Sequence, residues 1–97
     1  MDEATVREQA EGHAAAMVEG DLRGAARSLS DSGKADAPAI MENLPKSIDS
    51  AEVTEILLEG NEAAATIVYR GEGREVAVQS RWAEQEGAPM IVGLSLP

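Results

Sequence analysis

Alternation of apolar and polar residues between Glu62 and Leu96 is the feature that most limits how this chain can fold. A period of two places successive side chains on opposite faces and is typical of β-strands. Gly73 and Gly87 interrupt the alternation and favour tight turns there. The stretch therefore predicts three successive antiparallel strands, and residues 51–58 predict another strand before them.

The positions of the turns fix which residues face each other across these strands. A two-residue turn at Gly60-Asn61 pairs Leu58 with Ala63, and a turn at Glu72-Gly73 continues the same alternation. One predicted face carries Ile56, Leu58, Ala63, Ala65, Ile67, Tyr69, Val76, Val78, Ser80 and Trp82. The other carries Val53, Glu55, Leu57, Ala64, Thr66, Val68, Arg70, Glu75, Ala77, Gln79 and Arg81. A slip of one residue would exchange the two sets, so the alternation determines the register.

Two registers are open for the last hairpin. A three-residue loop at residues 86–88 pairs aliphatic residues with the helix-facing side of the preceding strand: Val92 with Trp82, Leu94 with Ser80 and Leu96 with Val78. A two-residue turn sends those aliphatic residues to the opposite face. The match between apolar residues favours the longer loop. Gly93 in mid-strand weakens the ladder and predicts a bulge or a sharp bend.

A first helix is predicted over residues 2–19, where apolar residues recur at helical spacing. Asp2 suits the N-cap, and Gly20 suits the left-handed position after the last turn. Gly12 lowers helix stability by about 1 kcal/mol relative to Ala, which predicts a close packing contact at that point. His13 lies beside the apolar stripe, either as a histidine partly under the sheet or as an acid or base in a pocket.

Two shorter helices are predicted before the first strand. The first covers residues 21–30, with an aspartate as its N-cap. Residues 31–34 are polar and predict a turn. Asp36 and Pro38 then open a third helix, which ends before Pro45. Helix capping accounts for the aspartates of this region better than metal binding does.

These elements predict an α+β fold in a single domain, residues 1–97, with N-terminal helices packed on a curved four-stranded antiparallel meander sheet. The face that carries Ile67 and Trp82 takes the helices. The opposite face keeps more aliphatic side chains than a solvated face usually does, which predicts a homodimer through that face. The candidate dimer residues are Val53, Leu57, Val68, Ala77, Gln79 and Arg81.

Charge and composition disfavour several classes of function. Eighteen acidic against eight basic residues give a net charge of −10, which disfavours nucleic acid and anionic membranes as partners. The chain has no cysteine and one histidine, so thiolate and multi-histidine metal sites are ruled out. No apolar run approaches the roughly 20 residues that span a bilayer, and the acidic N-terminus lacks an apolar export signal. A cytoplasmic protein without a cofactor is expected.

The order of these elements resembles the nuclear-transport-factor-2-like superfamily, which includes SnoaL-type polyketide cyclases and ketosteroid isomerases. The similarity covers nearly the whole chain but rests on order rather than on one specific motif. The local matches are Glu19-Gly20-Asp21, Ser50-Ala51-Glu52-Val53, Gly60-Asn61-Glu62-Ala63, Ser80-Arg81-Trp82, Gly87 and Met90-Ile91. The resemblance implies a cone-shaped α+β barrel with a pocket between the helices and the concave sheet.

Two functions remain open for such a pocket, whose candidate residues are His13, Tyr69, Ser80 and Trp82. Enzymes of the superfamily place acids and bases there, yet no aspartate follows Asp49 in this chain. That departure favours a non-catalytic module that dimerises or binds a small apolar ligand. The alternative is an isomerase or cyclase for a hydrophobic substrate, with His13 as base and Tyr69 as hydrogen-bond donor. A pocket of roughly 300 Å³ or more would favour the enzyme.

Overall fold

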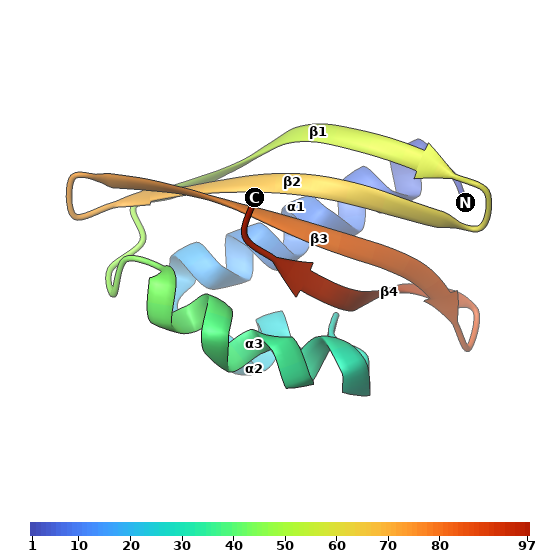
Figure 1. Cartoon of the computed structure of the whole chain (residues 1–97), viewed down its shortest axis with the longest axis horizontal. Coiled ribbons are helices and arrows are strands. Elements are labelled where there is room, and N and C mark those ends of the chain that lie inside the picture. The colour runs from blue at the N-terminus through green and yellow to red at the C-terminus, as the bar shows by residue number, and fades with distance from the viewer.

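A computed structural model covers residues 1–97 and has the predicted α+β architecture. The helices are α1 (Glu3–Glu19), α2 (Leu22–Ala26) and α3 (Asp31–Asn43). The strands are β1 (Ser50–Glu59), β2 (Glu62–Gly71), β3 (Arg74–Gln85) and β4 (Ala88–Ser95), and they form one antiparallel sheet in the order β1-β2-β3-β4. The three helices lie on one side of this sheet (Figure 1). The sheet is open, so the strands do not close into a barrel.

Helix α1 follows its prediction closely at both ends. The Asp2 carboxylate accepts a hydrogen bond from the Thr5 amide, and Gly20 adopts a φ of 75° after the last turn. The apolar stripe is buried against β1 and β2. The close contact predicted at Gly12 is wrong, because this residue is exposed and a Cβ there would meet no atom within 4 Å.

The boundaries predicted for the next two helices are wrong. Helix α2 ends at Ala26, and Leu29 instead forms a parallel bridge with Ile91 of β4. Helix α3 begins five residues earlier than predicted, at Asp31, with Ser30 as its N-cap. The Ser30 amide donates to the Ile91 carbonyl, which fixes the start of α3 against β4. A tertiary contact therefore decides these boundaries over local propensity.

The predicted pairing of β1 with β2 holds near their shared turn and fails beyond a bulge. Leu58 faces Ala63, as predicted, and the alternation continues as far as Glu55. Thr54 is then an extra residue without a partner, because Val53 faces Ile67 while Glu55 faces Thr66. The bulge inverts the alternation, so Val53 packs against the core instead of lying on the outer face.

The predicted three-residue loop of the last hairpin is also wrong. Strands β3 and β4 are joined by the two-residue turn Glu86-Gly87, with φ of 54° and 83°, which is the primed geometry that hairpins favour. Ile91, rather than Val92, lies opposite Trp82. A bulge at Val92, next to Gly93 where a bulge or bend was predicted, then restores the predicted pairing of Leu94 with Ser80.

The sheet places the predicted inner face against the helices. The residues with the least exposure between the two layers include Trp82, Ile67, Ile91 and Val6. The other buried apolar residues are Ala10, Ala14, Met17, Ala25, Ile40, Leu44, Ala63, Ala65, Tyr69 and Val78. Alanine is common in this set, so the helix–sheet interface contains several short side chains.

Candidate functional site

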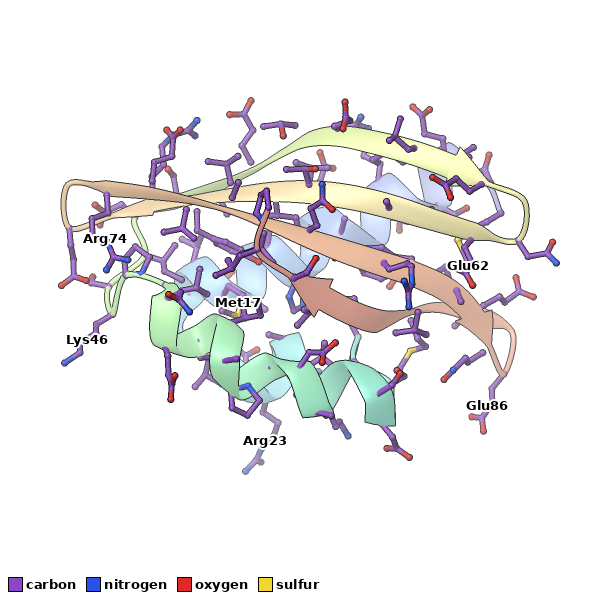
Figure 2. The ribbon with its side chains drawn as sticks, in the orientation of Figure 1. Met17, Arg23, Lys46, Glu62, Arg74 and Glu86 are labelled. Atoms are coloured by element: carbon purple, nitrogen blue, oxygen red, sulfur yellow. The ribbon has the colours of Figure 1, made fainter.

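An apolar cavity of about 190 Å³ lies between the helices and the sheet. All three helices contribute to its wall, and so do β2, β3 and β4. Figure 2 shows Met17 pointing into this space from α1. The lining residues are His13, Met17, Leu22, Ala25, Ala26, Leu29, Ala37, Ile40, Met41, Leu44, Tyr69, Val78 and Leu94.

Short side chains keep the cavity open. Ala25 and Ala26 of α2 and Ala37 of α3 face the cavity, where larger residues would fill it. Leu22 and Met41 are 56% and 42% exposed while still lining the cavity, so they form its mouth. The space is thus reached between α2 and α3.

His13 is the most polar residue of the cavity wall, and its hydrogen bond fixes its tautomer. Its side chain is buried, and Nδ1 lies 3.0 Å from the Ala25 carbonyl oxygen of α2. A carbonyl oxygen only accepts, so Nδ1 carries the proton and the Nε2 of the neutral ring is an acceptor. Nε2 makes no hydrogen bond to the protein and keeps some accessible surface. Burial lowers the pKa of His13, although the Ala25 carbonyl opposes the shift.

We expect His13 to make the chain less stable in mild acid. Its folded pKa lies below the ordinary 6.5, so the unfolded chain binds more protons between the two values. The stabilisation is complete above pH 6.5, falls as the pH drops through 6.5, and is lost once the pH passes below the folded pKa. Each pKa unit corresponds to about 1.4 kcal/mol. Urea unfolding across this range should show the loss in the wild type, and it should vanish in His13→Gln.

Tyr69 is the second polar residue of the cavity. Its side chain is 2% exposed, and its hydroxyl makes no hydrogen bond to the protein. Every fully buried polar side-chain atom of the chain has a hydrogen-bond partner. The Tyr69 hydroxyl has none, so it must keep some accessible surface. Tyr69 lines the cavity. Burial raises the pKa of Tyr69 strongly.

Tyr69 is the only tyrosine, so its ionisation is directly visible in alkaline solution. The folded pKa lies above the ordinary 10.0, so the unfolded chain releases its proton first and stability falls as the pH rises above 10.0. We expect phenolate absorbance to appear only together with the loss of circular dichroism. A separate, earlier ionisation of the folded chain would contradict the burial of this hydroxyl. The same chain in urea provides the unshifted control.

Ser80 and Trp82 were predicted for the pocket, and the structure places them in the core beside it. The Trp82 indole N–H donates to Ser80 Oγ at 2.9 Å, and Ser80 Oγ donates to the Ala65 carbonyl oxygen at 2.9 Å. Neither side chain lines the cavity. Their polar atoms are thus bonded to each other and to the backbone, which is a structural role.

The outer face of the sheet keeps five of the six predicted dimer residues. Leu57 is half exposed, and Val68, Ala77, Gln79 and Arg81 share its side of the sheet. The prediction of Val53 for this face is wrong, since the bulge at residue 54 turns its side chain inward. All three ion pairs of the chain lie on this outer face: Arg70 with Glu52 at 3.2 Å, Arg70 with Glu75 at 2.8 Å and Arg81 with Glu62 at 3.6 Å.

Two further aspartates of the helical half, Asp21 and Asp36, accept hydrogen bonds from backbone amides. Asp21 Oδ1 accepts from the Gly24 amide at 2.9 Å, which is the predicted cap of α2. Asp36 lies inside α3, not at its start, and Oδ2 accepts from the Leu94 amide of β4 at 3.1 Å. No group of three or more His, Cys, Asp or Glu side chains is arranged to hold a metal ion.

Two of the four predicted pocket residues, His13 and Tyr69, thus line the same cavity, and most of its wall was not predicted as a site. Ala37 and Leu29 are examples, since one lies in a helix whose start was misplaced and the other in a segment predicted as helix. The signal that could have found the cavity is the set of alanines on the sheet-facing sides of α2 and α3.

Comparison with known proteins does not assign the chain to a family. The chain matches no protein-family model, and no curated protein matches its sequence. The resemblance to the nuclear-transport-factor-2-like superfamily therefore stays a prediction. None of the helices is both long and apolar enough to cross a membrane.

Proposed function

We propose that the chain is a non-catalytic module that binds one small, largely apolar ligand between its helices and its sheet. The observation that carries the proposal is an apolar cavity with an open mouth, lined by His13 and Tyr69, whose Nε2 and Oη atoms the protein leaves unbonded. Buried tyrosine hydroxyls and histidine nitrogens usually find partners. A ligand seated in the cavity would supply them.

The cavity volume limits the size of this ligand. At about 190 Å³ it is smaller than the roughly 300–1,000 Å³ of drug-sized sites. An apolar cavity of about 150 Å³ is known to accept benzene. A molecule with a single ring therefore fits, and a steroid or a polycyclic polyketide does not.

The proposal is tested by filling the cavity. We expect toluene to shift the NMR methyl signals of Met17, Ile40 and Leu44, which line the cavity. Ala37→Leu places a larger side chain in the space and should abolish the shifts. Ala39→Leu makes the same change on the exposed side of α3 and should leave them intact. Shifts that persist in Ala37→Leu, or that never occur in the wild type, would contradict the proposal.

An isomerase remains the second candidate, because one cavity holds a neutral histidine acceptor and a protonated tyrosine. Burial lowers the pKa of His13 and raises that of Tyr69, and opposite shifts within one site are typical of acid–base pairs. No carboxylate lines the cavity, which favours the binding module. Cyclohexanone in D₂O distinguishes the two functions: exchange of its α-protons that depends on His13 indicates an enzyme, and unchanged background exchange indicates a binding module.

We also propose a homodimer through the outer sheet face, which no helix covers (Figure 1). Leu57 supports it as a half-exposed aliphatic residue, with Val68 and Ala77 on the same face. Leu57→Glu should shift sedimentation from dimer to monomer, whereas Leu58→Glu, on the opposite face, should not. A wild type that sediments as a monomer at high concentration would remove the idea. Membership of the nuclear-transport-factor-2-like superfamily and a cytoplasmic location also stay predictions.

A further inference from the structure

We infer that the ligand of the cavity is a neutral single-ring molecule that carries a hydroxyl group, as phenol does. The inference rests on the proposed binding function and adds the chemistry of the ligand. Three features of the cavity carry it: the fixed tautomer of His13, the free hydroxyl of Tyr69 and the absence of charged residues from the wall.

His13 requires a hydrogen-bond donor from the ligand. The proton on Nδ1 is committed to the Ala25 carbonyl at 3.0 Å, so Nε2 of the neutral ring offers only a lone pair. The side chain is 7% exposed and does not line any of four further hollows on the surface. A ligand hydroxyl donates to Nε2, whereas a ketone, an ether or a carboxylate has no proton to give.

Tyr69 also suits a hydroxyl group on the ligand. Its own O–H donates as well as accepts, and it is 2% exposed with no partner in the protein. A hydroxyl that donates to His13 Nε2 keeps its lone pairs free to accept from Tyr69. A hydroxyl is therefore the one group that suits both polar atoms, while a ring without a hydroxyl offers a partner to neither.

Charge excludes the ionised relatives of such a ligand. No Lys, Arg, Asp or Glu side chain lines the cavity, so a buried carboxylate or ammonium would have no counter-ion. The nearby basic side chains of Arg23 and Lys46 extend outward into solvent (Figure 2). The net charge of −10 further disfavours an anion. Phenol is therefore preferred over benzoate, which has the same ring.

The test compares phenol, toluene and benzoate, which share one ring and differ in the polar group. Titration of the whole chain, followed by NMR, should give phenol an affinity about tenfold to a hundredfold above toluene, with no benzoate binding. Tyr69→Phe removes only the hydroxyl, so phenol should lose about tenfold while toluene is unchanged. The ¹⁵N signals of His13 should report the Nδ1–H tautomer, and the Nε2 signal should move when phenol binds. Thermal unfolding checks that Tyr69→Phe remains folded.

The outcomes separate this inference from the function beneath it. If toluene and phenol bind equally well, the hydroxyl inference is overturned and the apolar binding module stands. If Tyr69→Phe weakens phenol and toluene alike, the hydroxyl of Tyr69 does not recognise the ligand and the inference is again overturned. Binding of phenol with no change at His13 Nε2 has the same consequence. If none of the three probes enters the cavity, the proposed function fails as well.

Discussion

Trp82→Ala should lower the free energy of unfolding by about 3–5 kcal/mol, the usual loss when a buried aromatic side chain is truncated. Trp82 has no exposed surface and lies between Ala63 of β2 and Ile91 of β4 on the inner face. Truncation leaves a cavity that small neighbours cannot fill, and it also removes the donor to Ser80. Domains of this size are stable by about 5–15 kcal/mol, so the loss is a large part of the total.

Urea unfolding measures this effect, and circular dichroism replaces fluorescence as the probe because Trp82 is the only tryptophan. Leu58→Ala is the control, since its side chain is 44% exposed at the end of β1, away from the proposed dimer face, and its truncation should change stability by about 0.5 kcal/mol. A loss below about 1 kcal/mol for Trp82→Ala would mean that this residue is not at the centre of the core.

Gly33→Ala should destabilise the chain by about 1–3 kcal/mol, although alanine favours helices. Gly33 lies in the first turn of α3, and an added Cβ would overlap the Ile91 carbonyl oxygen of β4. That oxygen belongs to the backbone and cannot turn away as a side chain does. The start of α3 would have to leave β4, which weakens the hydrogen bond from the Ser30 amide to Ile91.

Gly12→Ala is the matched control for this change. Gly12 lies in the interior of α1, and an added Cβ meets no atom within 4 Å. The substitution should therefore raise stability by about 0.5–1 kcal/mol through helix propensity alone. Opposite signs for the two variants in urea unfolding are the expected result. A gain in both would show that α3 does not pack on β4 at Gly33.

Local patterns predicted the parts of the fold that depend on neighbours in the chain. Asp2 and Gly20 were found as the ends of α1 because capping is a contact between residues a few positions apart. The hairpin that joins β2 to β3 was found because Glu72-Gly73 suits a tight turn and the alternation on both sides agrees. Where apolar residues recur with one period and without interruption, the sequence is sufficient to predict the element and its register.

The bulges could not be seen in the same way. Val53, Thr54 and Glu55 read as plain alternation, yet the extra residue moves Val53 from the outer face to the inner one. The bulge at Val92 reconciles a short turn with the position of Leu94, which is partly buried on the inner face. A bulge is a property of two strands together, because a residue is extra only with respect to the residues that face it on the partner strand.

The candidate site divides along the same line. His13 was predicted because a titratable residue beside a helical apolar stripe is visible in the sequence, and Tyr69 because strand alternation places it on the inner face. Ser80 and Trp82 were misassigned to the pocket because alternation gives the face of the sheet but not the position on it. Only the packing of α2 and α3 decides which part of that face borders the cavity and which part is filled.

The sequence by itself determined that this protein has an α+β fold, with helices on one face of a four-stranded antiparallel meander, because periodicity and turn chemistry act over a few residues. The tertiary structure alone decided where α3 begins, on which face Val53 lies and that His13 and Tyr69 share one cavity. These outcomes depend on contacts such as that of Ser30 with Ile91, which join residues far apart in the chain. No local pattern encodes such contacts, since their energy appears only when helices and sheet pack together.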